Sequence, residues 1–156
     1  MRLPNVFNSM NTVLKQVQID EMLQMNTESE RHGLILTEED AKDIIEARDH
    51  TLLSLGRIEL DIELTKKLIL AFCTSPFISQ EDYVSTLKEL QETFYYLKNE
   101  TEDEMGDDEL LTIIEDCFNS SEGSLELLQG RELDKFVRDY KNNKNKVNFI
   151  LEEEDE

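Results

Sequence analysis

The chain of 156 residues contains no tryptophan, two prolines, five glycines and two cysteines. These low contents exclude a collagen-like chain, a Pro/Gly-rich low-complexity chain and a disulfide scaffold. Apolar runs are short as well: the longest, residues 68–73, falls far below the roughly 20 residues that a membrane-spanning helix needs. No secretory signal, transit peptide or lipidation motif is present. We therefore expect a cytoplasmic protein without a membrane partner.

The chain is also poor in basic residues, with 16 lysines and arginines against 36 aspartates and glutamates, which gives a net charge of -20. Such a charge repels DNA, RNA and anionic membranes, so we expect no nucleic-acid partner and favour a basic protein partner. A hydrophobic fraction of 38% with this charge lies near the border between folded and disordered chains. The helical periodicity of the apolar residues indicates that the chain is folded.

Apolar residues recur at helical spacing through most of the chain. The clearest case covers residues 83–97, where the spacings are four, three, four and three. Start and stop signals separate the segments: Thr37–Asp40 resembles a capping box, Asp61 and Ser124 are further candidate caps, and Gly56 is a typical stop. Alternating β patterns are nearly absent. The sequence predicts an all-α, single-domain helical bundle of five to seven helices joined by short loops.

The helical signals are strongest over residues 19–140, which we predict to form the helical domain. Residues 1–18 contain an apolar stripe weakened by asparagine and serine, so their structure is uncertain from the sequence. Residues 142–146 are typical of a solvated linker. Residues 141–156 end in five consecutive acids, and we interpret them as an acidic tail that is either disordered or docked through a few apolar side chains.

The charge is concentrated in one part of the chain. Residues 77–123 hold 14 acids and only two bases, a net charge of -12. The plain interpretation is a solvated helix-loop-helix corner; the functional one is a docking surface for a basic partner, and in either case the corner should be the most salt-sensitive part of the fold. The candidate partner-binding residues are the corner acids Glu100, Glu102, Asp103, Glu104, Asp107 and Asp108, together with Tyr96 as an exposed aromatic residue.

The residue patterns of common chemical sites are missing. A calcium loop centred on Gly106 fails at three of its four ligand positions, so only a looser cation site among the neighbouring acids remains as an alternative. Two cysteines and two histidines, all far apart, do not suggest a zinc site, and Cys73 and Cys117 are predicted to be reduced core thiols. Walker A and dinucleotide fingerprints are absent. We predict no catalytic, cofactor-binding or metal-binding residue.

Arg48 interrupts the apolar stripe of its predicted helix. The plain interpretation is a long stem packed on the core, with its head paired to a carboxylate. The functional interpretation is a pocket cation that binds a small anion, with His50 as its neighbour in the sequence. Arg48 and His50 are therefore the candidate ligand-pocket residues.

Three blocks of the sequence resemble a known family. They are the segment from Gly33 through Arg48, the segment from Ala71 through Glu81, and the segment from Glu89 through Leu110. The set is similar to a family of small proteins from Firmicutes that is known only as a domain of unknown function, and the resemblance covers about residues 19–140. It implies a bacterial cytoplasmic protein and no established activity.

Three functions remain open at this point. The first is a non-enzymatic interaction module that docks a partner through its acidic surface. The second is a small-ligand binder or enzyme with a pocket around Arg48. The third is an acidic mimic of nucleic acid, which needs carboxylates in a spaced row. The missing catalytic patterns and the localised charge favour the first; the sequence predicts no oligomeric state.

Overall fold

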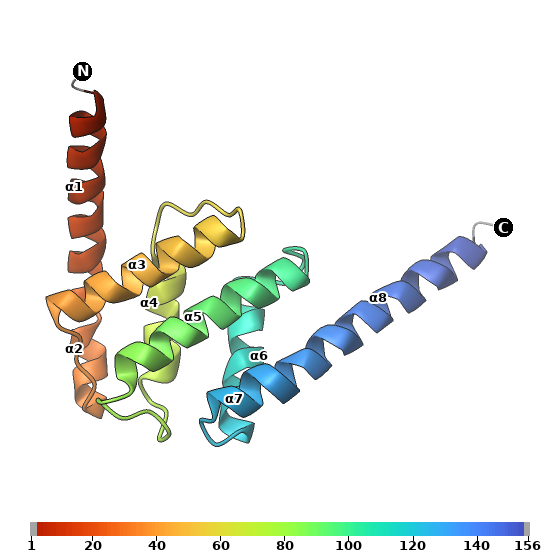
Figure 1. Cartoon of the computed structure of the whole chain (residues 1–156). Helices are drawn as coiled ribbons and strands as arrows, with labels where there is room; N and C mark the ends of the chain where they lie inside the picture. Colours follow the sequence, from red (N-terminus) through yellow and green to blue (C-terminus); the bar gives the residue numbers. More distant parts are fainter. Residues whose placement is uncertain (1–2, 155–156) are drawn as a thin grey trace. The chain divides into compact units, whose positions relative to one another are not determined.

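The structure, a computed structural model, describes the backbone of residues 3–154 and the side chains of residues 12–144. In that part of the chain it is all-α, with no strand and six helices of ten residues or more (Figure 1). The long helices are α1 (Leu3–Gln24), α3 (Glu38–Ser54), α4 (Glu63–Phe72), α5 (Tyr83–Glu100), α6 (Asp107–Ser120) and α8 (Leu133–Glu154). The short ones are α2 (Asn26–Ser29), η1 (Glu30–His32), α7 (Leu125–Leu127) and the π-helical turn η2 (Leu128–Glu132). The predicted all-α helical bundle is confirmed.

The chain forms two compact units, Met1–Glu92 and Thr93–Glu156, and α5 contributes residues to both. The apolar seam predicted along α5 is buried throughout. Its members are Tyr83, Leu87, Leu90, Phe94 and Leu97. The two tyrosines that follow Phe94 differ in exposure as expected: Tyr95 is buried and Tyr96 is exposed.

Helix α3 begins and ends at the predicted signals. The Thr37 hydroxyl accepts the backbone N–H of Asp40, and the Asp40 carboxylate accepts that of Thr37, which completes a capping box. At the other end Gly56 adopts a φ of 68°, and the N–H of Arg57 donates back to the carbonyl of Leu52 at 2.8 Å. Because glycine enters this left-handed conformation cheaply, the chain turns sharply here toward α4.

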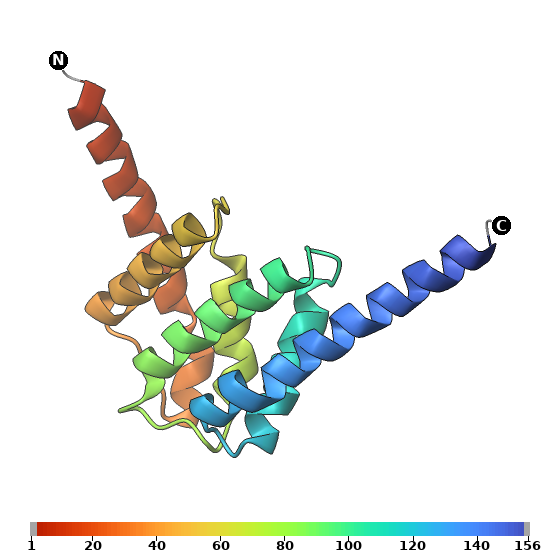
Figure 2. The same cartoon turned by 45° about the vertical axis from the view of Figure 1, so that its right-hand side comes forward.

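In the first unit, α1 packs against α3 and α2 against α4 (Figure 2). Their buried apolar side chains form a core that also contains a hydrogen-bonded polar pair. Thr65 on α4 donates from its hydroxyl to the Gln91 side chain at 2.5 Å, and the Gln91 amide donates to the carbonyl of Ile44 at 3.2 Å. This pair links α3, α4 and α5 inside the core.

Two amide side chains hold the segment between η1 and α3. Asn26 donates to the carbonyl of Leu36 and accepts its N–H, both at 2.9 Å. Gln80 does the same with both backbone groups of Ile35 at 2.8 Å. Backbone groups that would otherwise need water are thereby satisfied, so this segment is held in a single conformation.

The second unit is built from the end of α5, α6 and the start of α8, with η2 packed against both α6 and α8. Its buried apolar side chains are Phe94, Tyr95, Leu97, Leu110, Leu111, Ile114, Phe118, Leu128, Leu133 and Val137. The Ser124 side chain caps α7 as predicted, by accepting the N–H of Leu127. Gly130 lies within η2, which continues directly into α8.

The segments at the two ends are helical rather than irregular. Helix α1 begins at Leu3, within the segment whose structure the sequence left uncertain, and α8 continues to Glu154. The solvated linker predicted at residues 142–146 is wrong, because these residues lie inside α8. Side-chain contacts from this part of α8 to the loop after α5 stabilise the helix there, as described below. Docking of the tail through its apolar residues, 147–151, lies outside the described side chains.

The two cysteines lie one in each unit. Both are free thiols; Cys73 is buried and Cys117 is half-buried. Burial raises the pKa of both thiols and nearby carboxylates raise it further, whereas a backbone hydrogen bond lowers that of Cys73; these shifts favour the protonated thiols. Cys73 thus lies in the core as predicted, whereas Cys117 is only partly buried.

Candidate functional site

The predicted partner-binding acids lie around the loop between α5 and α6, which we call the acidic corner (residues 100–108). Helix α5 ends at Glu100, and the buried Thr101 hydroxyl donates to the carbonyl of Leu97 at 2.9 Å. Glu102 and Asp103 then adopt φ values of 54° and 60°. Left-handed backbone at two consecutive residues with side chains is unusual and costs conformational energy, so other contacts must hold this loop.

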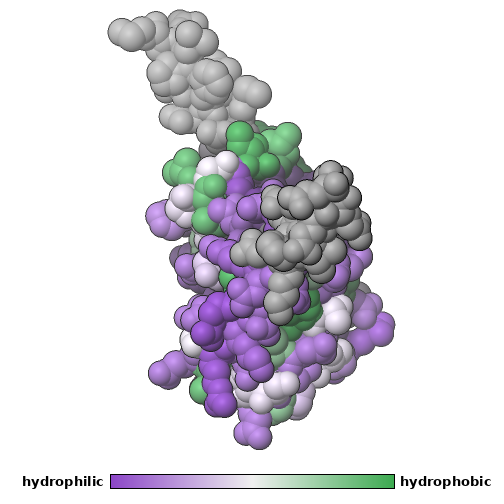
Figure 3. Space-filling view, turned by 90° about the vertical axis from the view of Figure 1, so that its right-hand side faces the viewer, coloured by the Kyte–Doolittle hydropathy of each residue, from purple (hydrophilic) through white to green (hydrophobic). Residues whose placement is uncertain are grey.

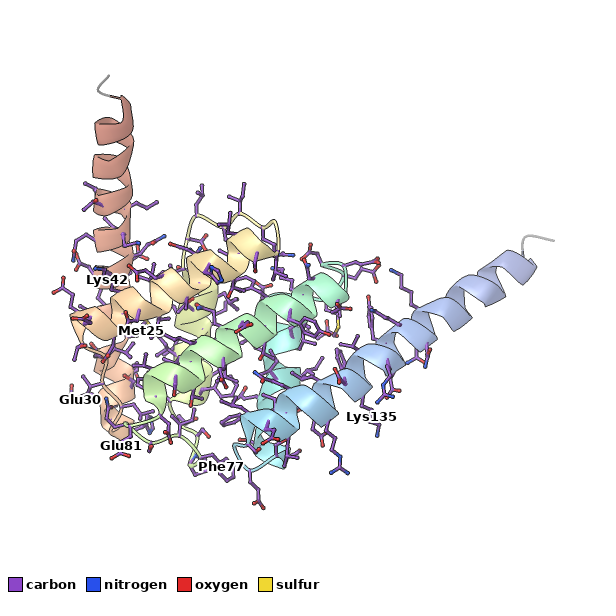
Figure 4. The ribbon with its side chains drawn as sticks, in the orientation of Figure 1. Met25, Glu30, Lys42, Phe77, Glu81 and Lys135 are labelled. Atoms are coloured by element: carbon purple, nitrogen blue, oxygen red, sulfur yellow. The ribbon has the colours of Figure 1, made fainter. Side chains whose placement is uncertain are left out.

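The contacts that hold the acidic corner come from α8. The Lys144 ammonium lies 2.6 Å from a Glu102 carboxylate oxygen and 2.8 Å from a Glu104 oxygen. One turn earlier, the Lys141 ammonium lies 2.6 Å from Glu100. Figure 4 shows side chains of α8, beyond the labelled Lys135, pointing toward this loop. Three carboxylates of the corner are thus paired with two lysines on one helix face.

Tyr140 completes the contact between α8 and the corner. Its hydroxyl donates to the Glu104 carboxylate and lies 3.3 Å from the carbonyl oxygen of Thr101. Its ring stacks on Phe136, with the ring centroids 6.5 Å apart. Tyr140 therefore touches both the loop backbone and a corner carboxylate, which fixes the position of α8 along the loop.

The remaining base at the corner is on α5. The Lys98 ammonium lies 2.7 Å from an Asp107 oxygen at the start of α6, and 5.9 Å from the centroid of the Phe94 ring. This half-buried pair joins the two sides of the loop. Asp107 also lies in the first turn of α6, where the positive end of the helix dipole favours a carboxylate.

Hydrogen bonds at the corner shift the ionisation of both partners. The pKa of Glu104 is lowered, mainly by the hydrogen bond from Lys144 and then by that from Tyr140. The pKa of Lys144 is raised by Glu102 and Glu104, and that of Lys141 by Glu100. Lys141, Glu102 and Glu104 are exposed and Lys144 and Glu100 are partly exposed, so these ion pairs contribute little to stability and are weakened by salt.

Tyr96 lies beside the corner. Partial burial raises the pKa of its hydroxyl first, and the charge of Glu100, one turn further along α5, raises it further, while Lys141 opposes the shift. The predicted partner-binding residues are thus brought together on the second unit. The bases that pair with them were missed, because the lysine-rich segment after Tyr140 was interpreted as a linker.

The sequence contains a pattern that could have identified these lysines as partners of the corner acids. Tyr140, Lys141 and Lys144 have the spacing of one helix face, which becomes meaningful once α8 is known to be helical there. That helix cannot be inferred from residues 142–146 alone, because asparagine is a weak helix former.

Arg48 occupies the second predicted site, on α3 in the first unit. Its side chain is 2% exposed. One terminal nitrogen, Nη1, lies 2.8 Å from the Asp49 carboxylate, and the other, Nη2, donates to the carbonyls of Glu59 and Asp61 at 2.6 Å each. The guanidinium therefore fastens the loop between α3 and α4. Only its Nε atom has no hydrogen-bond partner within the described residues.

The pocket at Arg48 is small and carries both signs of charge. It has a volume of about 290 Å³ and is lined by Leu14, Lys15, Gln18, Arg48, Asp49, Glu59 and Leu60. His50 is exposed and does not line it, so the two candidate ligand-pocket residues are not brought together. A small anion would meet two carboxylates and an arginine whose terminal nitrogens are already bonded.

Neither a metal centre nor a membrane span occurs in the described part of the chain. Among these residues, no group of three or more histidine, cysteine, aspartate or glutamate side chains is arranged to hold a metal ion. None of the helices there is both long and apolar enough to cross a bilayer.

Comparison with known proteins gives one match. The model of a family of unknown function, DUF6323, matches residues 21–146. The match extends beyond residue 140, so the lysines of α8 that hold the acidic corner lie inside it, although the sequence resemblance ended before them. No curated protein and no solved structure matches the chain. Because the family model covers well over half of its residues, the chain belongs to DUF6323, a family of unknown function.

Proposed function

We propose that the protein is a non-enzymatic interaction module that binds a basic helical segment of another protein at the acidic corner. The observation that carries this proposal is that the corner already holds such a segment from its own chain. Lys141 and Lys144, three residues apart on α8, place their ammonium groups against three corner carboxylates. The chemistry that a partner would need is therefore that of α8 itself: a helix with basic side chains one turn apart.

The contacts of α8 are suited to exchange with a partner. Lys141 is exposed and Lys144 half-buried, and ion pairs at such surface positions contribute little to stability. A basic helix with more than two positive charges offers the corner more cations than the two lysines of α8 do. The net charge of -20 adds a long-range attraction that raises the rate of encounter with a basic partner.

The other two functions have less support. The terminal nitrogens of Arg48 are bonded to the protein, which leaves a ligand little to bind in its pocket. A nucleic-acid mimic needs a spaced row of carboxylates, whereas two of the corner acids, Glu102 and Glu104, converge on the single Lys144. Both arrangements favour an interaction module.

The experiment measures binding of a labelled amphipathic peptide helix that carries lysines three and seven residues apart. The full chain should bind it at low salt and lose it at about 0.5 M salt, where screening is complete within a few Å. The Glu102→Gln/Glu104→Gln variant should bind about three- to tenfold more weakly. The matched control, Glu122→Gln/Glu126→Gln, removes the same charge elsewhere in the second unit and should bind as the parent chain does.

A second variant tests the competition directly. Lys141→Met/Lys144→Met removes the internal ligand of the corner, so peptide affinity should rise several-fold. Equal affinity in the corner variant and its control would refute the proposal, and so would an absence of binding at low salt.

A further inference from the structure

Several large apolar side chains are exposed on α1 and on the loop between α3 and α4 in the first unit. Val13 on α1 is 64% exposed, and on the loop between α3 and α4 the values are 89% for Ile58 and 77% for Leu60. Leu14 and Val17 on α1 are also exposed. We call these five residues the apolar face. Figure 3 shows hydrophobic residues near the top of the coloured part of the molecule.

The two segments of the apolar face are joined. Leu14 and Leu60 line the same pocket, and the Gln18 amide on α1 donates to the carbonyl of Leu60 at 3.2 Å. Arg48 holds the loop on both sides of Leu60 through the carbonyls of Glu59 and Asp61. Ile58 and Leu60 therefore lie on a loop that hydrogen bonds from Arg48 and Gln18 hold in place. Apolar groups held in this way are typical of an interaction surface.

The sequence of α1 has the spacing of a helix that pairs with another helix. Leu3, Val6, Met10, Val13 and Val17 follow one another at three, four, three and four residues. A stripe of this kind is the seam of paired helices. Val13 and Val17, the two members of this sequence stripe whose side chains are described, are both exposed.

Charge indicates what can cover this face. The first 19 residues contain no acid and two bases, Arg2 and Lys15, although the chain carries -20 overall. A second copy of so acidic a chain is repelled almost everywhere else, but it can approach along α1. The rim of the face carries both signs, with Lys15 beside Asp49 and Glu59. In a two-fold pair, such a rim sets opposite charges against each other.

We propose that the apolar face is the interface of a two-fold homodimer formed through α1 and the loop between α3 and α4. A basic partner gains little charge attraction from the first 19 residues, which hold no acid, and an acidic partner is repelled by the rest of the chain. A copy of the same surface satisfies both its apolar stripe and its mixed rim.

The test is the mass of the full chain by sedimentation equilibrium over a range of concentrations. The parent chain should move from 18.2 kDa toward twice that mass as concentration rises, and added salt should strengthen the dimer by screening self-repulsion. Val13→Lys/Val17→Lys should weaken dimerisation at least tenfold. Because these lysines lower the negative charge, a loss of dimer identifies the apolar contact as its cause.

The control is Leu70→Lys, because Leu70 is exposed on α4 to the same extent as Leu14 on α1, 46%. This variant should dimerise as the parent chain does, and circular dichroism should show equal helix content in all variants. A monomer at every concentration, or equal dimerisation in the α1 variant and the control, would overturn the proposal. A mass higher than a dimer would overturn the two-fold interface.

This inference and the proposed function are separable. The Val13→Lys/Val17→Lys variant leaves the acidic corner intact, so it should bind the basic peptide as the parent chain does. Salt acts in opposite directions on the two associations, because it weakens the peptide complex and strengthens the dimer.

Discussion

Arg48 on α3 donates from Nη2 to the carbonyl oxygen of Asp61, 13 residues further along the chain, at 2.6 Å. The same nitrogen reaches the carbonyl of Glu59, so one buried side chain fixes both ends of the turn that displays Leu60. An arginine in an apolar stripe is thus explained by the backbone it holds rather than by a ligand. A planar guanidinium suits this role, because it presents several donors in a rigid fork.

Replacing Arg48 should destabilise the protein. Arg48→Met keeps the apolar stem but leaves two carbonyls without their donor, so we expect a loss of about 2–3 kcal/mol in the free energy of unfolding. Urea denaturation measures it. Arg48→Lys should recover only part of the loss, because an ammonium lacks the fork. His50→Ala, at an exposed position on the same helix, is the control and should change stability by less than about 0.5 kcal/mol.

The buried pair of Thr65 and Gln91 should behave as a unit. Thr65→Val preserves the shape of the side chain but leaves the Gln91 oxygen without a donor, which should cost about 1–3 kcal/mol of stability. Gln91→Leu made in addition should cost less than the sum of the two single changes, with a coupling of about 1 kcal/mol. Thr112→Val, the same change at an exposed position, should be nearly neutral. Additive effects in the double variant would contradict the coupling.

Acid should release α8 from the corner. The folded pKa of Glu104 lies below its ordinary value of 4.5, so its contribution is present above pH 4.5 and is lost as pH falls through the lowered value. Amide hydrogen exchange of residues 141–144 should accelerate in that range beyond its intrinsic pH dependence. Glu104→Gln should remove most of this acceleration, whereas Glu126→Gln should leave it unchanged. Exchange that stays slow below pH 4 would contradict the assignment to Glu104.

Tyr83 should limit stability at alkaline pH. Burial raises its pKa from 10.0 to about 12, an effect that the neighbouring Ser29 hydroxyl partly offsets. Because the unfolded phenol ionises first, stability is fully present below pH 10 and falls as pH rises toward 12.

Tyr83→Phe tests this assignment. The hydroxyl makes no hydrogen bond within the described residues, so the variant should match the parent chain within about 0.5 kcal/mol at neutral pH. At pH 11 it should be the more stable of the two in urea denaturation. An equal loss of stability in both chains between pH 10 and 12 would point to another group.

Local signals in the sequence predict much of the fold because they act over a few residues. The capping box at Thr37 and Asp40, the stop at Gly56 and the seam from Tyr83 to Leu97 each depend on neighbours within one or two turns. Such short-range terms are readable without knowing what packs against the helix. The same reasoning failed at residues 142–146, where the local preference for a linker is overcome by contacts to a distant loop.

By itself the sequence determined the all-α class, the burial of the α5 seam and the location of the acidic corner. The tertiary structure alone decided which charges meet. Lys144 lies 40 residues from Glu104 in the sequence, and Arg48 lies 11 residues from Glu59. The members of each pair come within hydrogen-bond distance only when the helices pack. The physical reason is that an ion pair or hydrogen bond acts over a few Å in space, whereas the sequence records only separation along the chain. Patterns with a helical period can be read in one dimension, but the partners of Arg48 and of the corner acids depend on the three-dimensional path of the chain.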